Sequence, residues 1–251
     1  MITDPLFYAV AVPAVLLAGV SKASGNGLGM IAVPLMALVV SPAVAAAVML
    51  PILCALDALG LWAWRGRADP AVLRTVLPGA ALGIAIGAWV FFALDARWVK
   101  AILGAETLAF ALHRIVAHRA IAARRPRAPS HLHGGVWGAL SGFTSTIAHA
   151  GSPPLMQYLL PLKLDKERLV ATTVIFFTAV NYTKLLPYGL LGLFDGRGLA
   201  TALVLSPAVP IGYGAGLWIV KRLSERWFHR LLVGSLLLIG VKLLWDAFVG
   251  G

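Results

Sequence analysis

Two long stretches of this chain contain no Asp, Glu, Lys or Arg, and they restrict its fold more than any other feature. They are Ala23–Leu56 and Ala128–Leu162. Each is longer than the roughly 20 residues that cross a bilayer as a helix, and each is divided by glycines and prolines, which interrupt helices. We therefore predict that Leu6–Val40 and Gly134–Pro161 are hairpins of broken helices, each leaving the membrane on the side where it entered.

The remaining apolar segments are long enough to cross a membrane once each. Hydrophobic residues make up 60% and charged residues 12% of the chain, whereas soluble domains hold roughly 45–50% and about 25%. The predicted crossings are Ser41–Trp64, Thr75–Leu94, Trp98–Ala117, Leu169–Leu190, Gly198–Val220 and Leu231–Val249. The predicted fold is therefore all-α, a polytopic membrane protein with about eight transmembrane or half-membrane helical segments.

The basic residues predict the orientation of these segments. The 21 Lys and Arg outnumber the 10 Asp and Glu, and in a membrane protein such an excess marks cytoplasmic loops rather than a nucleic-acid partner. With both termini outside, fifteen Lys and Arg fall on cytoplasmic loops and only Arg97, Lys100 and Arg197 on outer ones. This bias predicts a multi-pass protein of the cell (inner) membrane, surrounded by the lipid bilayer, with both termini outside.

The two halves of the chain share residues at a constant spacing of 129 positions. The pairs are Pro78 and Pro207, Gly83 and Gly212, Gly87 and Gly216, Leu94 and Leu223, Arg97 and Arg226, and Trp98 and Trp227. A further match is Pro34-Leu35-Met36 with Pro154-Leu155-Met156. Because a hairpin plus three crossings has odd parity, the second copy is predicted to be inverted, as in many secondary transporters. The predicted parts are a first repeat (1–117), a basic cytoplasmic linker (118–133) and a second repeat (134–251). The alternative is an old duplication in a protein that does not transport.

The breaks of the two hairpins are rich in hydrogen-bond donors. Non-helical backbone lies at membrane depth only where protein or a water-filled cavity satisfies its N–H and C=O groups, and the N–H groups of a restarting helix favour an anion. The candidate substrate-binding residues are Ser21, Lys22, Ser24, Gly25, Asn26 and Gly27 in the first break, and Thr144, Ser145, Thr146, His149 and Ser152 in the second. Together they predict a site for one small oxyanion.

Each of these residues also has a plain structural interpretation. Lys22 stands near the end of a short first helix, from which its ammonium group can extend to the interface. Serine and threonine often bond the backbone of their own helix, and His149 is also compatible with a hydrogen-bonded histidine of the core. The cluster indicates a site more strongly than any single member.

A second set of polar residues follows one face of a predicted crossing. The set is Thr178, Asn181, Lys184 and Tyr188, at helical spacing among apolar residues. A lysine inside a membrane segment is a functional candidate by default, because burial of its charge is costly. Asp57 occupies the matching place in the first half, opposite Asn181. Asp57 and Lys184 form either a structural ion pair, or a site in which Lys184 faces the substrate and Asp57 balances its charge or carries a proton.

The sequence shows no strong motif for covalent or cofactor chemistry. It contains no phosphate-binding Walker motif, which argues against ATP as the driving force within this chain. The histidines near the linker lack the helical His and Glu spacing of a metal site, and Cys54 is the single cysteine. Ser141–Gly142 with His149 is a weak match to an intramembrane protease, since nucleophile and base would share one short segment. We therefore expect neither an enzyme nor a bound cofactor.

At these residues the chain resembles the sulfite exporter TauE/SafE family of membrane transporters. The resembling segments are Gly19-Val-Ser-Lys22 through Gly29 to Val33-Pro34-Leu35, Asp57 with Gly60-Leu-Trp-Ala-Trp64, Gly142-Phe-Thr-Ser145, His149-Ala-Gly-Ser-Pro-Pro154, Thr172-Thr-Val-Ile-Phe-Phe177, Asn181 and Lys184. The resemblance covers essentially the whole chain. It implies transport of a small sulfur-containing or related organic anion, such as sulfite, sulfoacetate or another sulfonate. It also implies export in many members, driven by an ion gradient for which the proton is one candidate.

Two classes of function are considered for this chain. The first is a secondary transporter that binds a small anion between the hairpins and exports it by alternating access. The second is a non-transporting polytopic scaffold, or a lipid-modifying enzyme, whose basic linker binds anionic lipid. Convergence of the polar residues on one buried, solvent-reachable cavity favours the transporter, whereas dispersed or fully paired residues favour the scaffold. A homo-oligomer is compatible with both.

Overall fold

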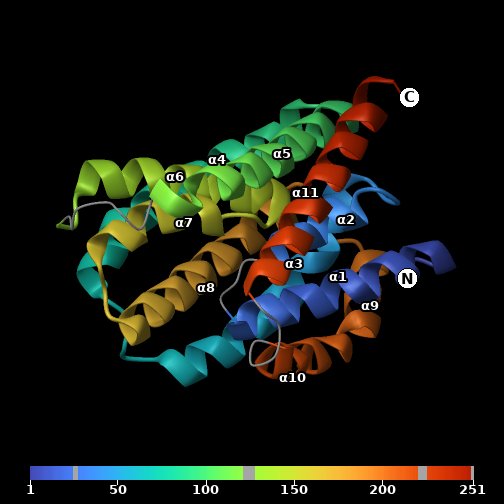
Figure 1. Cartoon of the computed structure of the whole chain (residues 1–251). Helices are drawn as coiled ribbons and strands as arrows, with labels where there is room; N and C mark the ends of the chain where they lie inside the picture. The colour runs from blue at the N-terminus through green and yellow to red at the C-terminus, as the bar shows by residue number, and fades with distance from the viewer. Residues whose placement is uncertain (25–27, 121–127, 220–224, 250–251) are drawn as a thin grey trace.

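The computed structural model describes residues 1–24, 28–120, 128–219 and 225–249, and within them it contains helices and no strand (Figure 1). The longer helices are α1 (Pro5–Ser24), α3 (Pro42–Trp64), α4 (Pro70–Ala93), α5 (Ala96–Ala120), α6 (His131–Ala148), α8 (Lys166–Leu190), α9 (Gly196–Leu205), α10 (Ala208–Ile219) and α11 (Glu225–Phe248). The shorter ones are η1 (Leu28–Ile31), α2 (Ala32–Met36), α7 (Ser152–Leu159) and η2 (Leu160–Leu162). The all-α fold predicted from the sequence is confirmed.

Capping residues define where several helices begin. In four helices the residue before the first turn accepts a hydrogen bond from a backbone N–H of that turn. These residues are Ser41 before α3, Asp69 before α4, Asp165 before α8 and Asp195 before α9. Such bonds satisfy N–H groups that have no partner within the helix. In α3 and α4 a proline follows the cap, where the missing N–H costs nothing.

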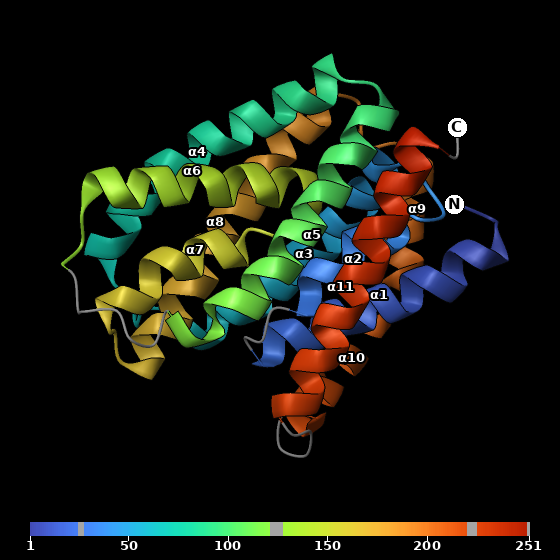
Figure 2. The same cartoon turned by 45° about the horizontal axis from the view of Figure 1, so that its top comes forward.

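Helices from the two halves of the chain pack closely through glycines. α4 lies along α6, and α10 lies along α1 (Figures 1 and 2). A Cβ atom at Gly83 would lie 1.9 Å from the carbonyl oxygen of Ala139, and one at Gly212 would lie 2.7 Å from that of Leu16. Gly83 and Gly212 form one of the pairs spaced by 129 positions, so this pair marks two close helix crossings. α3 also packs on α8, and α5 on α11.

We expect Gly83→Ala to separate α4 from α6 and to lower the thermal unfolding midpoint. Overpacking typically destabilises a protein by about 1–3 kcal/mol, and at Gly83 the space is filled by backbone, which cannot move aside as a side chain can. Gly135→Ala is the matched control, since a Cβ at Gly135 of α6 meets nothing within 4 Å. Equal midpoints for the two purified variants would contradict this account of the crossing.

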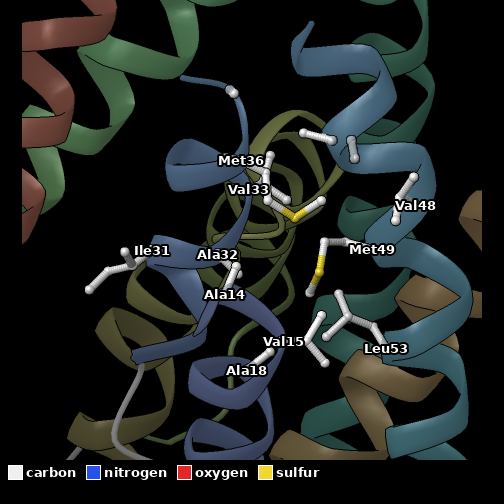
Figure 3. Packing of buried hydrophobic residues seen from close by; sticks show 14 of the residues in the cluster. Ala14, Val15, Ala18, Ile31, Ala32, Val33, Met36, Val48, Met49 and Leu53 are labelled. Carbon is white, nitrogen blue, oxygen red and sulfur yellow. The ribbon is translucent and has the colours of Figure 1, made fainter. Parts of the chain in front are cut away.

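Both predicted hairpins contain broken helices. The first consists of α1, η1 and α2, and the second of α6, α7 and η2. The matching tripeptides Pro34-Leu35-Met36 and Pro154-Leu155-Met156 lie in the second limbs, in α2 and α7. The first hairpin packs on α3, with Val15, Met36 and Met49 among the buried side chains of the shared core (Figure 3).

One predicted crossing is not continuous. The sequence predicts Gly198–Val220 as a single helix, whereas the structure has two helices, α9 and α10, that meet at a bend of 43°. Pro207 lies between them and has no N–H with which to continue the hydrogen-bond ladder of α9. The apolar composition alone does not reveal this bend.

In the part of the chain that the structure describes, four helices are long and apolar enough to cross a membrane, namely α1, α3, α4 and α8. The bent pair α9–α10 makes a fifth if it is one span. α5, with 25 residues, carries charged residues along its length, whereas the charged residues of the 24-residue α11 lie toward its two ends. Together with the broken hairpins, these helices form a multi-pass membrane protein.

Segments predicted to face the outside lie together. The Arg97 Nε donates a hydrogen bond to the carbonyl oxygen of Ala247 at 2.7 Å, which joins the start of α5 to the end of α11. The Ile2 N–H donates to the Thr201 hydroxyl at 2.9 Å, which joins the N-terminus to α9, and both termini lie at one end of the bundle (Figure 1). A pocket of about 570 Å³ lies between the α2–α3 connection, the start of α5 and the end of α11.

Candidate functional site

The break of the second hairpin is formed by a left-handed residue. His149 has φ 51° and ends α6, and the N–H groups of His149 and Ala150 return to the carbonyl oxygens of Ser145 and Thr144. A non-glycine residue in this conformation is uncommon and is often found at functional sites. Here the turn directs the imidazole toward α3, where its Nε2 lies 3.0 Å from the carbonyl oxygen of Ala46.

Lys184 of α8 is completely buried against this break. Its Nζ donates to the carbonyl oxygen of Ser145 at 2.8 Å and to the Ser145 hydroxyl at 3.0 Å, and it lies 2.7 Å from Nδ1 of His149. These three contacts match the three donors of an ammonium group. All three partners are neutral acceptors when the His149 ring is neutral, so they satisfy the hydrogen bonds of Lys184 without neutralising its charge.

The contacts of His149 select one tautomer of its ring. As long as Lys184 is charged, Nδ1 has to accept its hydrogen bond, so the ring proton resides on Nε2 and is donated to Ala46. The imidazole therefore connects α8 to α3 through the end of the second hairpin.

Asp57 of α3 is the buried carboxylate of the site, and it binds the other lysine. It forms an ion pair with Lys22 at the end of α1 and accepts a hydrogen bond from Nδ2 of Asn181 at 2.5 Å. Only 1% of the Asp57 side chain is exposed, against 22% of Lys22, whose Nζ also lies 5.5 Å from the centre of the Phe177 ring. The ion pair considered from the sequence, Asp57 with Lys184, is therefore wrong in its partner. Lys22 turns inward instead of extending to the interface.

These residues form one cluster, because Asn181 and Lys184 lie one turn apart on α8. We call it the central cluster and define it as Lys22, Asp57, Ser145, His149, Asn181 and Lys184. It joins the ends of α1 and α6, one from each hairpin, to α3 and α8. With both lysines protonated and His149 neutral, the cluster carries one net positive charge.

The remaining hydroxyl candidates are occupied or lie apart from the cluster. The hydroxyls of Thr144, Thr146 and Thr178 donate to carbonyl oxygens of their own helices, which is the plain interpretation considered for them. Tyr188 is completely buried and donates to the carbonyl oxygen of Thr146 at 2.5 Å, and so braces α8 against α6.

The other candidates of the hairpin breaks are placed as follows. Ser21 lies beside Gly29, where a Cβ would come within 3.2 Å of the Ser21 Cβ. Ser152 begins α7 and is half-buried. Gly25, Asn26 and Gly27, together with the side chain of Ser24, lie outside the described residues.

Sequence reasoning missed one contact of the central cluster and one buried acidic residue outside it. The contact is that of His149 with the carbonyl oxygen of Ala46. Because this oxygen belongs to the backbone of an apolar helix, the sequence does not predict its role. Glu106 of α5 has both carboxylate oxygens buried without a hydrogen-bond partner, and it was detectable as an acidic residue within the predicted crossing Trp98–Ala117. Among the described residues, no group of three or more His, Cys, Asp or Glu is placed to hold a metal ion.

Apolar helices, two broken hairpins and a buried charged cluster at the breaks of those hairpins are typical of membrane transport proteins. The family model for the sulfite exporter TauE/SafE matches residues 11–243, and the chain belongs to this family of membrane transporters. No curated protein and no solved structure matches the chain.

Proposed function

We propose that this protein is a secondary transporter that exports a small sulfur-containing or organic anion, such as sulfite, sulfoacetate or another sulfonate. The observation that carries the proposal is that the central cluster holds two lysines, Lys22 and Lys184, but a single carboxylate, Asp57. A charge held among apolar helices is costly unless a partner of opposite sign is present, and Asp57 already binds Lys22 and Asn181. A small anion supplies the missing charge, and membership of the TauE/SafE family supports this substrate class.

Lys184 is the proposed anchor for the anion. Its ammonium group exchanges the acceptors Ser145 and His149 for oxygen atoms of the substrate, and Asn181 orients the anion from the next turn of α8. Lys22 is the more exposed of the two lysines, so it provides the first electrostatic attraction. The residues of the central cluster are mutually paired in the structure, which is the arrangement expected of a scaffold. Membership of the TauE/SafE family is the reason for preferring the transporter, in which the anion replaces some of these partners.

The proposed transport cycle is alternating access between two inverted repeats. The crossing of α4 on α6 matches that of α10 on α1 when the halves are exchanged, and α3 on α8 and α5 on α11 are pairs of equivalent helices. This is the packing expected of two copies related by an axis in the membrane plane. Rocking of one copy against the other opens the central cluster to each side in turn.

The proposed function is tested by flux in proteoliposomes. Labelled sulfite, sulfoacetate and a carboxylate control are followed with and without a pH gradient. We expect protein-dependent flux of at least one sulfur-containing anion above protein-free vesicles. Absence of flux for all of them, from protein shown to be folded, would contradict the proposed substrates and favour a polytopic scaffold.

The proposed orientation has both termini outside. We expect a cysteine introduced at Thr3 in a Cys54→Ala background to react with a membrane-impermeant reagent in intact cells. A cysteine at Arg65, in the exposed connection between α3 and α4, should react only after permeabilisation. The reverse pattern would invert the orientation while leaving the fold unchanged.

A further inference from the structure

The carboxyl group of Glu106 in α5 is buried without a hydrogen-bond partner. Its two oxygens are the buried side-chain oxygens left unpaired in the part of the chain that the structure describes. The residue as a whole is half-buried. Its exposed atoms are therefore those of the backbone or the methylene groups, and the carboxyl group points into the protein. Buried polar groups are nearly always hydrogen-bonded, and an exception indicates a group whose partner is present in only one state.

Among the described residues, the helices packed on α5 provide no ion-pair partner for this carboxyl. α11, α3, α6 and α2 pack against α5. The titratable residues described on them are Arg230, Lys242 and Asp246 of α11, Cys54 and Asp57 of α3, and His131, His133 and, at its end, His149 of α6. None of these described residues forms a hydrogen bond with the Glu106 carboxyl. Lys242 pairs with Asp246, and Asp57 with Lys22.

An ionised carboxylate in this position would lack both water and a cation. Such a charge is far more costly to bury than a carboxylic acid. The conformation described here therefore accommodates Glu106 with its proton bound. Loss of the proton favours a different conformation, one in which water reaches the carboxylate. Proton binding is in this way linked to the choice between two conformations.

We infer that Glu106 is a proton-binding site, separate from the central cluster, that couples transport to the proton gradient. The coupling role of Glu106 rests on the proposed function of the protein as a transporter, whereas proton binding by Glu106 does not. The step is reversible association: the carboxylate takes one proton from water on one side of the membrane, becomes the carboxylic acid, and returns the proton to water on the other side. No other bond forms or breaks.

The same face of α5 carries a second titratable residue. His113 lies seven residues after Glu106, which is two helical turns along one face, and its Nε2 is hydrogen-bonded to Gln157 of α7. His113 stands toward the end of α5 that leads into the basic linker. Water admitted along this face would connect Glu106 to that side of the membrane.

Infrared spectroscopy of the purified protein in lipid tests proton binding directly. We expect a carbonyl stretch of a protonated carboxylic acid at neutral pH that is present in the wild type and absent from Glu106→Gln. Thr107→Val is the matched control on the next residue of α5, because the Thr107 hydroxyl bonds only the carbonyl oxygen of Leu103, and it should keep the band. A wild-type spectrum without a band that depends on Glu106 would overturn the inference, whatever the flux shows.

Flux measurements test the coupling. For one proton per anion, each unit of pH gradient supports about tenfold accumulation of sulfoacetate. Glu106→Gln should lose this accumulation while retaining exchange of sulfoacetate at equal pH, and Thr107→Val should retain both. Undiminished accumulation by Glu106→Gln would show that Glu106 does not couple. If wild-type protein shows the infrared band and transports none of the tested anions, the proton site stands and the proposed substrates fail.

Discussion

Replacement of Lys184 by methionine should weaken binding of the transported anion by about 30-fold or more, since loss of one partner of a buried charge pair costs at least about 2 kcal/mol. Methionine retains the length of the side chain in its fully buried position but removes the ammonium group. The measurement is calorimetric titration of the purified variant with sulfite and sulfoacetate.

Lys242→Met is the control for this experiment. Lys242 also lies in an apolar helix, but it is exposed and pairs with Asp246 on the same helix, away from the central cluster. Binding should be unchanged in this variant. Wild-type affinity in a folded Lys184→Met variant would show that the anion binds elsewhere and would remove the main support for the proposed site.

Replacement of Asp57 by asparagine should be the most destabilising single substitution in the central cluster. It removes the negative charge that Lys22 pairs with, and it replaces one of the two acceptor oxygens shared by Lys22 and Asn181 with an amide NH2 donor. Removal of one partner of a buried ion pair costs about 3–5 kcal/mol, because the other charge remains uncompensated. Thermal unfolding in detergent should show a correspondingly large fall in the midpoint.

Two further variants distinguish the uncompensated charge of Lys22 from a general effect of losing a carboxylate. Asp165→Asn removes an exposed carboxylate at the start of α8 but retains an oxygen that can cap the helix, and it should cost about 1 kcal/mol or less. The double variant Lys22→Met with Asp57→Asn should recover part of the lost stability, because the uncompensated charge is gone. A double variant less stable than Asp57→Asn would contradict the ion-pair explanation.

The sequence predicted the features that depend on local chemistry. Glycines and prolines in charge-free stretches located the two broken hairpins, and the spacing of Asn181 and Lys184 placed them on one face of α8. Both kinds of inference rest on short-range rules, namely helix breaking and helical periodicity. Neither requires knowledge of which helices are neighbours.

Short-range rules could not predict which lysine pairs with Asp57, because that depends on which helices are neighbours. Either Lys22 or Lys184 could have paired with Asp57. Lys22 does so because α1 ends beside α3, whereas Lys184 of α8 lies against the end of α6 and binds Ser145 there. Likewise, periodicity shows which way a threonine faces but not whether its hydroxyl turns back to its own helix, as that of Thr178 does. The left-handed turn at His149 was similarly hidden, since no glycine marks it.

The crossings of α4 on α6 and of α10 on α1 also determine when the protein can be completed during its synthesis. α4 is made before α6, and α1 long before α10, so each glycine-rich surface enters the membrane ahead of the helix that covers it. Gly19 of α1 and Gly83 of α4 are each covered by a helix of the other half. The crossing of α4 on α6 can form once α6 has been synthesised, whereas the crossing of α10 on α1 has to wait for α10. Each half of the protein therefore depends on a helix of the other half for its closest packing.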